Sequence, residues 1–544
     1  MTKLIKACLL LLCFIGVFAL SAQDCYDDYL RQGKQAYDDL QFEQALNLFN
    51  AARICPDNLD TEFQEVADWI TKANNGYIDA IKAARDAALA SEERALKAQI
   101  EAERQATLSE ARRLADLANQ ELVNGDEEEA LGLSYLALSS VEATAIEPVH
   151  LAFGNAVARS SQVQIDHEAP VLDMGFTGID QIWSRSSDGS VQLWDPQSED
   201  IRTISNPNDP AQICVGNADR LIRIGSRGGV QSYDLMGQPL KKFTSHEAPV
   251  LTASLAPMGS TFATADRSGT INLSDETGLI KTLHESDPVH QVGFTKDGSS
   301  ILVRSTSHRV RVFDVGGSSS VDLSHEAYIY QVSESPVGGL LLTAGADGKA
   351  VLWNQQGGKI AEMLHDHPVT HAVFSPDGGQ IATADISGNI SLWDVSGSRS
   401  KTLQGPASKI VQLLWAPNGN RLTAADDKHH VWTWESEATP VAVIDYHTAA
   451  ILSIAYSPNS DLLLTTSQDG SAWLWNNRGE AKMQIVETDS PVYKGMFSPD
   501  GQRIVIACAD HYLLSVKNPV IAYSELKQSP PQFTAEQKVK FGLN

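Results

Sequence analysis

Histidines are most densely clustered where His365, His367 and His371 stand beside Asp366. Imidazole nitrogens bind zinc, but zinc sites also draw on cysteines or carboxylates at set spacings, and this segment offers no such frame. We therefore expect these histidines to be structural, with His367 in that role, and we predict no metal site. The acidic run Asp126–Glu129 lacks the spaced oxygen ligands of a calcium loop and suits the first turn of a helix.

Catalytic motifs are missing from the sequence. It contains no GxxxxGK[ST] phosphate loop, no HExxH and no GxSxG, which are the usual signatures of nucleotide, zinc-protease and serine-hydrolase chemistry. We expect no enzyme activity and no cofactor. Lys and Arg number 42 against 68 Asp and Glu, so the net charge is −26. This charge repels nucleic acid and anionic lipid, so we expect no nucleic-acid partner.

The N-terminus has the pattern of a signal peptide over residues 1–22. Lys3 and Lys6 precede an apolar stretch from Leu9 to Leu20, which is short for a membrane span. Small residues follow, so cleavage is expected near residues 21–23. An uncleaved membrane anchor is the alternative. We expect an exported chain, periplasmic or extracellular, with no transmembrane segment after cleavage.

Four cysteines remain after such cleavage: Cys25, Cys55, Cys214 and Cys508. Helices of about 15 and about 13 residues on either side of a turn near Leu40 would be antiparallel and would bring Cys25 and Cys55 to the same end. We therefore predict a Cys25–Cys55 disulfide, which an oxidising compartment permits. Closing this loop would contribute roughly 3 kcal/mol. Cys214 and Cys508 are expected to be unpaired core residues.

Residues 24–60 resemble one tetratricopeptide repeat, in which small residues let two helices approach closely. The positions that carry the resemblance are Gly33, Ala36, Tyr37, Ala45, Phe49, Ala52 and Pro56. A single repeat cannot bury its own apolar face. This helical hairpin must therefore stack on the helices that follow.

Residues 61–160 are rich in strong helix formers and predict a long helix over 62–123 and a second helical hairpin. The long helix could pair as a coiled coil. The alternative is a solvated connector, since the apolar heptads are broken and the alanine content is high. We favour a connector packed on its neighbours, because sustained heptads are the stronger sign of a coiled coil. Pro148 suits the first turn of a last helix. The segment also resembles the linker helices of bacterial STAND-type signalling proteins.

The rest of the chain repeats with a period of about 40 residues. Five repeats end in a tryptophan strand, at Trp194, Trp353, Trp393, Trp434 and Trp475, and the last three steps are 40, 41 and 41 residues. The intermediate positions and one further step complete nine repeats. This pattern resembles the WD40 family of β-propellers. We predict a helical region followed by a nine-bladed WD40 propeller over 161–526, with a C-terminal tail at 527–544.

The resemblance implies a buried hydrogen-bond chain in each blade, made by a His, a Ser or Thr, an Asp and the Trp. Such a chain fixes one geometry because every buried polar group must be satisfied. In the first blade the corresponding residues are His167, Ser187, Asp188 and Trp194. In the eighth blade they are His447, Ser467, Asp469 and Trp475.

Propellers of this family close by lending a strand from one end of the chain to the blade at the other end, which removes open sheet edges. The expected donor is SQVQID (161–166), placed as the outer strand of the last blade beside HYLLSV (511–516). The competing donor is VIAYSEL (520–526).

The family usually binds partners on the face formed by the turns between the second and third strands. These turns carry basic residues in repeats two to four and acidic residues in repeats one, five, eight and nine. The candidate contact residues are Asp188, Arg227, Arg267, His308, Asp347, Lys428, Asp469 and Asp510.

The leading hypothesis is an extracytoplasmic scaffold that binds other proteins, because repeat surfaces bind proteins or peptides as a rule. The first alternative is a TolB-like periplasmic propeller working with an outer-membrane or peptidoglycan complex, although the five tryptophan strands argue against it. The second is a propeller enzyme, which would need carboxylates or histidines converging on the central channel.

Overall fold

The computed structural model describes residues 22–543, apart from short gaps at 56–59, 142–146, 178–180, 197–199, 205–209, 218–219, 244–245, 258–259, 317–319 and 436. Except for Ala22, the predicted signal peptide lies outside the described residues. The chain divides into two compact units, Met1–Ala106 and Thr107–Asn544. Their boundary falls inside one helix, α4 (Asp60–Asn124), rather than between the hairpin and the long helix.

The first unit is a helical hairpin covered by the start of α4. Helix α2 (Ala22–Asp38) and helix α3 (Phe42–Arg53) pack through small residues and Phe49. A Cβ at Gly33 would lie 2.5 Å from the Phe49 ring, so only glycine allows this approach. Trp69 of α4 stacks on Phe49 with 5.6 Å between ring centroids. The third helix thus buries the face that the hairpin cannot bury alone.

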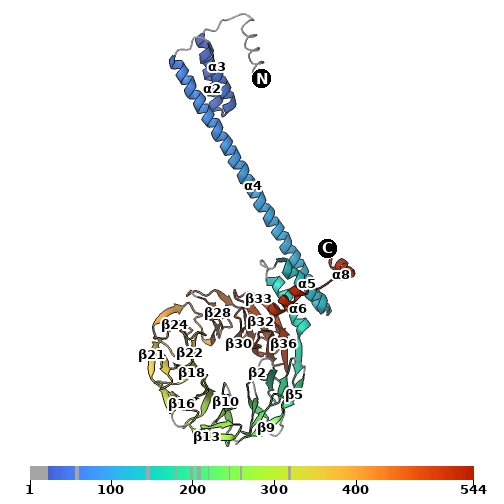
Figure 1. Ribbon diagram of the computed structural model, residues 1–544, viewed down its shortest axis with the longest axis vertical. Coiled ribbons are helices and arrows are strands. Elements are labelled where there is room, and N and C mark those ends of the chain that lie inside the picture. The colour runs from blue at the N-terminus through green and yellow to red at the C-terminus, as the bar shows by residue number, and fades with distance from the viewer. Residues whose placement is uncertain are drawn as a thin grey trace. The chain divides into compact units, whose positions relative to one another are not determined.

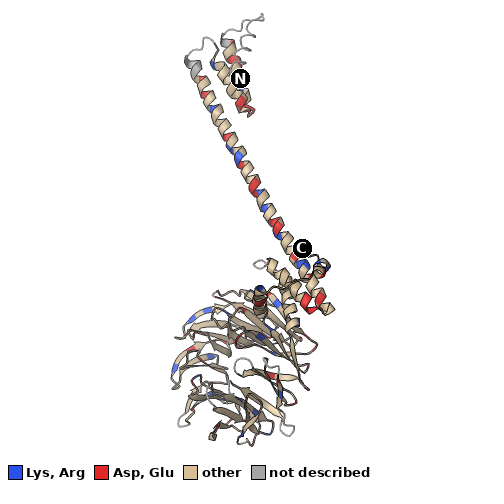
Figure 2. Cartoon of the chain, turned by 45° about the vertical axis from the view of Figure 1, so that its right-hand side comes forward, with Lys and Arg blue, Asp and Glu red and all other residues tan. Residues whose placement is uncertain are grey.

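The middle of α4 is exposed along its whole length from residue 77 to residue 107. Charges of both signs follow one another along it (Figure 2), and some pair within the helix, as Lys97 does with Glu93 at 2.7 Å. Such pairs support a solvated helix by a few tenths of a kcal/mol each. The expectation that the long helix packs on its neighbours is therefore wrong for this middle part, which is the alternative solvated connector, whereas both ends of α4 do pack.

The second unit contains four further helices around the end of α4. Helices α5 (Glu127–Val141) and α6 (Glu147–Ser161) form the predicted second hairpin, and α7 (Pro519–Gln528) and α8 (Ala535–Phe541) follow the propeller. These helices share one apolar core. The C-terminal tail belongs to it, because Phe541 is only 2% exposed and its carbonyl accepts a hydrogen bond from Arg113 Nη1 at 3.0 Å.

The predicted end of the propeller at 526 is wrong, because the last strand ends at Lys517 and α7 follows. Asn518 caps α7 by accepting a hydrogen bond from the Val520 amide, and Pro519 occupies the first turn. Both residue types are start signals for a helix. The alternative closing strand at 520–526 is therefore helical instead.

The propeller consists of nine four-stranded antiparallel sheets (Figure 1). The innermost strands are β2 (Val171–Thr177), β6 (Ala211–Gly216), β10 (Val250–Leu255), β14 (Val289–Phe294), β18 (Ile329–Glu334), β22 (Val369–Phe374), β26 (Ile410–Trp415), β30 (Ile451–Tyr456) and β34 (Val492–Phe497). The second strands are β3 (Gln181–Ser186), β7 (Leu221–Gly225), β11 (Phe262–Asp266), β15 (Ser300–Ser305), β19 (Leu340–Gly345), β23 (Gln380–Asp385), β27 (Leu422–Asp426), β31 (Leu462–Ser467) and β35 (Arg503–Cys508).

The third strands carry the tryptophans where a blade has one. They are β4 (Val191–Trp194), β8 (Val230–Tyr233), β12 (Thr270–Asp275), β16 (Arg309–Asp314), β20 (Lys349–Asn354), β24 (Ile390–Asp394), β28 (Val431–Trp434), β32 (Ser471–Asn476) and β36 (Tyr512–Lys517). The outer strands are β5 (Ile201–Ile204), β9 (Pro239–Lys242), β13 (Gly278–His284), β17 (Ser320–Ser324), β21 (Lys359–Leu364), β25 (Arg399–Leu403), β29 (Ala442–Ile444), β33 (Ala481–Glu487) and β1 (Val163–Asp166).

The ring closes as the sequence predicts. Strand β1 pairs antiparallel with β36, with Ile165 opposite Leu513, and becomes the outer strand of the ninth blade. Strands β2 and β34 are neighbours, so the first and last blades meet. The nine repeats and the helical-then-β fold class are confirmed. No helix in the described parts of the chain has the length and apolar character needed to cross a membrane.

Candidate binding surface of the propeller

The eighth blade contains the predicted hydrogen-bond chain with one member replaced. His447 Nδ1 lies 3.0 Å from Asp469 Oδ2 and its Nε2 lies 2.7 Å from Thr465 Oγ1. Trp475 Nε1 donates to the same Thr465 oxygen at 2.9 Å. Burial lowers the pKa of His447, although the charge of Asp469 opposes this shift. The imidazole is therefore a neutral structural group.

The choice of Ser467 as the hydroxyl of this chain is wrong. Ser467 lies opposite Ile451 at the start of the inner strand, and its hydroxyl donates to the carbonyls of Ala449 and Ala450. Thr465 lies opposite Trp473 on the same face, one strand period nearer to the tryptophan end. Only the middle of the strand is within reach of both the imidazole and the indole.

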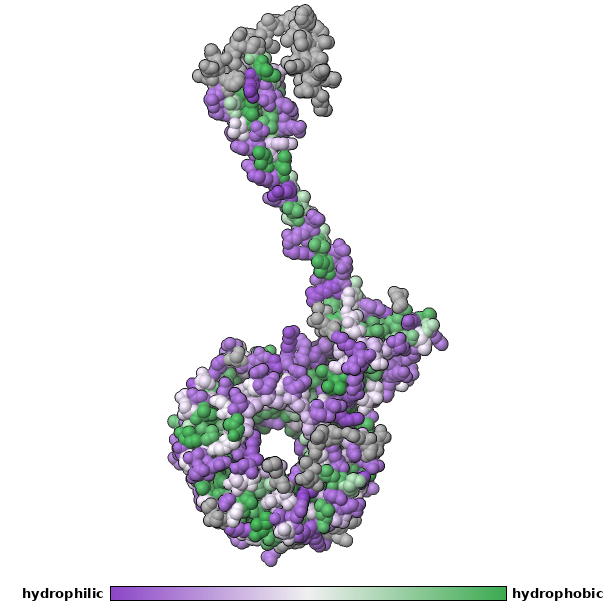
Figure 3. Space-filling view, viewed as in Figure 1, coloured by the Kyte–Doolittle hydropathy of each residue, from purple (hydrophilic) through white to green (hydrophobic). Residues whose placement is uncertain are grey.

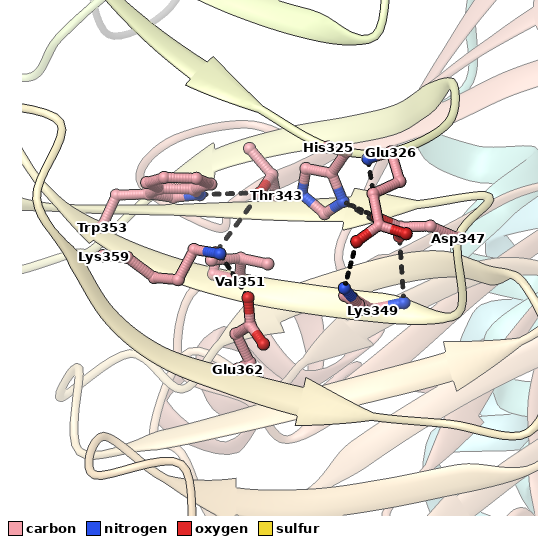
Figure 4. A network of polar contacts seen from close by, with 9 residues as sticks. All are labelled: His325, Glu326, Thr343, Asp347, Lys349, Val351, Trp353, Lys359 and Glu362. Atoms are coloured by element: carbon pink, nitrogen blue, oxygen red, sulfur yellow. Dashed lines mark hydrogen bonds and ion pairs between the residues drawn. The ribbon is translucent and has the colours of Figure 1, made fainter.

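The fifth blade repeats this arrangement (Figure 4). Thr343 Oγ1 lies 2.7 Å from His325 Nε2 and accepts from Trp353 Nε1 at 2.8 Å. Asp347 bonds His325 Nδ1 at 3.0 Å and accepts from the backbone amides of residues 326 and 349 at 3.1 Å. The carboxylate thus joins the loop before the inner strand to the turn after the second strand.

The first blade also takes its hydroxyl from the middle of the second strand. His167 Nε2 lies 2.8 Å from Ser184 Oγ, and Ser184 is buried. Ser187, the residue chosen from the sequence, is exposed in the turn, so that choice is wrong. Asp188 is also exposed and bonds Ser186 and the Ser190 amide rather than the histidine. Trp194 is buried.

In the sixth blade the histidine of the hydrogen-bond chain is His365 and not His367. Thr383 Oγ1 lies 2.9 Å from His365 Nε2 and accepts from Trp393 Nε1 at 2.8 Å. Burial lowers the pKa of His365 to about 4. The His367 side chain is half exposed and its Nδ1 lies 3.6 Å from Asp385 Oδ2. The expected structural role therefore belongs to the histidine two residues earlier.

A different group meets the geometry of a cation site in the described residues: Glu121, Asp126 and Glu129. Lys540 of α8 already places its ammonium there, with Nζ 3.1 Å from Glu121 Oε2 and 2.7 Å from Glu129 Oε2. The protein's own cation therefore balances this acidic group and fastens the C-terminal helix to α4 and α5.

The second residue of every inner strand is a β-bulge. The pairing register shifts across this residue in all nine blades. Six of the nine bulged residues are large apolar side chains that are 36–41% exposed. We call these six the apolar collar: Leu172, Leu251, Tyr330, Val411, Leu452 and Tyr493. The other three positions hold Gln212, His290 and Thr370.

The apolar collar surrounds the central opening at one face of the ring. Each inner strand pairs only with the strand outside it, so its exposed side chains face the opening visible in Figure 3 or the adjoining face. The start of each inner strand lies beside the turn that ends the second strand, as Val171 does beside Ser186. We call this face the turn face.

The turn face is rigid because each turn is tied to the inner strand in the same way. The amide of the first turn residue donates to the carbonyl just before the inner strand in all nine blades, as Ser187 does to Pro170 at 2.8 Å and Gln468 to Ala450 at 2.8 Å. A bulge also aims one extra side chain out of the pleat. The apolar collar is thus a built feature of the ring.

The structure separates the eight predicted contact residues into two groups. Those that are exposed on the turn face are Asp188, Arg227, Arg267, His308, Lys428 and Asp510. Asp347 and Asp469 instead face inward and hold the histidines. These two carboxylates are structural, so the acidic side of the predicted surface is smaller than the sequence suggested.

Sequence reasoning missed the apolar collar, although a signal for it exists. Each collar residue directly follows a β-branched residue that opens its inner strand, as in Pro-Val-Leu (249–251) and Pro-Val-Tyr (491–493). A half-buried strand should alternate, so two apolar residues in succession predict either a buried strand or an exposed apolar side chain.

Comparisons with known proteins agree with the fold. A family model described as the first β-propeller of IFT122 matches residues 274–517, and a model of the WD-domain G-beta repeat matches residues 237–275. The chain therefore contains WD40 repeats in a nine-bladed propeller.

Two individual proteins also show similarity to this chain. "Restriction of telomere capping protein 1" from Lodderomyces elongisporus is 28% identical over 186 residues, and the match covers 29% of this chain but only 15% of that protein. The crystal structure of the computationally designed Ika8 protein is 15% identical, with a TM-score of 0.45, covering 65% of this chain and 98% of the other.

Proposed function

We propose that this chain is a non-catalytic scaffold outside the cytoplasm, whose propeller binds an apolar segment of a partner protein at the turn face. The apolar collar is the observation that carries the proposal. Six large apolar side chains occur at one structural position around a single opening. Exposed apolar groups gathered in this way mark interaction sites, whereas scattered ones need no explanation.

The surroundings of the apolar collar suit such a contact. Arg227 and Arg267 are exposed on the turns of the second and third blades, and Lys428 is exposed on the turn of the seventh. Charged residues around an apolar centre set specificity and association rate more than affinity. The bulges and the turn hydrogen bonds hold the apolar groups in place before a partner arrives. Little conformational entropy is then lost on binding.

The extracytoplasmic part of the proposal is supported by the cysteines. Cys25 and Cys55 form a disulfide in the first unit, with Cα atoms 6.2 Å apart. Disulfides of this structural kind persist in oxidising compartments and are rare in the cytosol. The pattern of residues 1–22 points to the same compartment.

The proposal can be tested with paired variants in a pull-down from envelope extract followed by quantitative mass spectrometry. The collar variant is Leu251→Ser with Leu452→Ser, on blades three and eight. The control is Leu240→Ser with Ile360→Ser, which are exposed apolar residues on outer strands. We expect a partner that the control retains and the collar variant loses. Equal capture by both variants would refute binding at the collar.

A further inference from the structure

An apolar cavity of about 280 Å³ lies within the second unit, where its helices meet the eighth blade. Described residues of α5, α6 and α7 form one wall, and described residues of the eighth blade form the other. The main apolar lining residues are Leu138, Phe153, Leu462, Val520 and Tyr523. Phe153 and Tyr523 pack edge to face with 5.6 Å between centroids, so this wall is ordered aromatic surface.

Among the described residues that line this cavity, one is a lysine. Lys482 of β33 lines it, and the Lys482 side chain is only 16% exposed. It forms a long ion pair with Glu480, whose Oε2 lies 3.9 Å from Lys482 Nζ. The carboxylate of Glu480 already accepts a hydrogen bond from Asn476 Nδ2 at 2.6 Å. The ammonium is thus largely removed from water while its counter-ion is loosely placed.

The position of Lys482 is fixed by the packing of α6 on the blade. A Cβ at Gly154 would lie 2.2 Å from the Lys482 carbonyl oxygen, so the helix passes directly over this residue. Asn155 Oδ1 accepts a hydrogen bond from the Gln484 amide at 3.2 Å, two residues further along β33. The cavity is therefore built between two elements that cannot slide past each other.

We propose that this cavity binds a small carboxylate with an apolar body, such as a medium-chain fatty acid. The carboxylate would pair with the Lys482 ammonium, and the chain would lie among Leu138, Phe153 and Tyr523. An anion is the ligand that a desolvated, loosely paired ammonium favours. Drug-sized ligands fill pockets of about 300–1,000 Å³, so this cavity suits a smaller molecule. The site is separate from the apolar collar.

Near pH 7 the described lining of the cavity carries its positive charge on Lys482 and not on His150. Burial lowers the pKa of His150, on the same wall, to about 4, so its imidazole is neutral near pH 7. Burial lowers the pKa of Lys482 to about 8. The charged groups that face Lys482 are Glu480 and Arg478 from the β32–β33 turn and Glu147 from α6, and Asp461 also lines the cavity.

Binding is tested on the full exported chain with octanoate as the probe, by calorimetry and thermal unfolding. Octylamine and octanol are the matched ligands of opposite and zero charge. We expect octanoate to bind and to raise the unfolding temperature, and octylamine to do neither. Affinity should fall above pH 8, because the ammonium loses its proton while the carboxylate stays ionised. Equal binding of octylamine, or no binding of octanoate at millimolar concentration, would overturn the proposal.

Variants of residues that line the cavity test whether octanoate binds there. Lys482→Met keeps an unbranched apolar side chain one atom shorter than lysine and removes the charge. It should weaken octanoate binding at least about tenfold, since a charge-assisted contact is lost. Lys242→Met, on the exposed outer strand of the second blade, is the control and should bind normally. If Lys482→Met fails to fold, Val520→Trp fills the cavity from a position that is 43% exposed and should abolish binding. Unchanged octanoate affinity in a folded variant of either kind would place the ligand elsewhere.

Discussion

Thr465 Oγ1 lies 2.7 Å from His447 Nε2, and the two residues are 18 positions apart in the sequence. The same separation joins Thr264 to His246, Thr343 to His325 and Thr383 to His365, at 2.7–2.9 Å. A hydroxyl in the middle of the second strand therefore holds the histidine of the preceding loop in at least four blades.

Substituting Thr465 with valine should destabilise the propeller. The variant keeps the side-chain shape but leaves His447 Nε2 and Trp475 Nε1 without their buried partner, which costs about 1–3 kcal/mol. Chemical unfolding followed by tryptophan fluorescence measures the loss. Ser187→Ala, in the exposed turn of the first blade, is the control and should change stability by less than about 0.5 kcal/mol. Similar losses in the two variants would show that the buried network is not what stabilises the blade.

Repetition made the fold predictable, because nine imperfect copies reinforce one another while any single copy is weak. The inner-strand starts and the closing strand at 163–166 followed directly from the period. The identity of the hydroxyl did not, because Thr465 and Ser467 both have the right chemistry on the same strand face. The 18-residue separation selects Thr465, and it also selects His365 over His367.

The sequence did not predict the apolar collar, the Lys482 cavity or the end of the propeller, and each was missed for a different physical reason. The apolar collar depends on a bulge, which shifts register by one residue and turns an apolar side chain outward. The Lys482 cavity depends on α6 and α7 meeting β33, and contacts between elements so distant in sequence leave no local pattern. The end of the propeller was missed because VIAYSEL suits a strand by composition, whereas Asn518 and Pro519 begin a helix.

The propeller should lose stability as the pH falls from about 6.5 to 4. Burial lowers the pKa of His365 to about 4, while the unfolded chain retains a value near 6.5. In this window the unfolded state binds a proton that the folded state excludes, so protons favour unfolding. Burial also lowers the pKa of His167 and His447. The unfolding temperature should therefore drop from pH 7.5 to 4.5.

Histidine variants distinguish this effect from general acid denaturation. His365→Asn should have a lower unfolding temperature at pH 7.5 but a shallower pH dependence. His308→Gln, on an exposed turn, should keep the slope of the natural chain. The same slope in all three proteins would mean that His365 does not contribute to the pH dependence.

Removing the disulfide should loosen the first unit and leave the propeller intact. Cys25 and Cys55 close a loop with a sequence separation of 30, which stabilises by roughly 3 kcal/mol on the chain-entropy model. In the Cys25→Ala, Cys55→Ala variant, hydrogen exchange should accelerate in α2 and α3 and remain unchanged in the strands. Cys214 and Cys508 are buried and unbonded, so a reducing agent should reproduce this pattern. Two free thiols at 25 and 55 in protein isolated without reducing agent would contradict it.

The closure of the ring by β1 predicts that a charge buried in this strand destabilises the propeller. Ile165 is 1% exposed and packs with Val171, Trp194 and Leu513, so it joins the first and ninth blades. An aspartate there would bury a charge without a partner, and Ile165→Asp should cost more than about 3 kcal/mol. Gln164→Asp, exposed on the same strand, is the control and should fold normally. Hydrogen exchange in Ile165→Asp should rise first in β34–β36 and β2, because that seam loses its covering strand. Uniform exchange around the ring, or unchanged stability, would show that the propeller closes without β1.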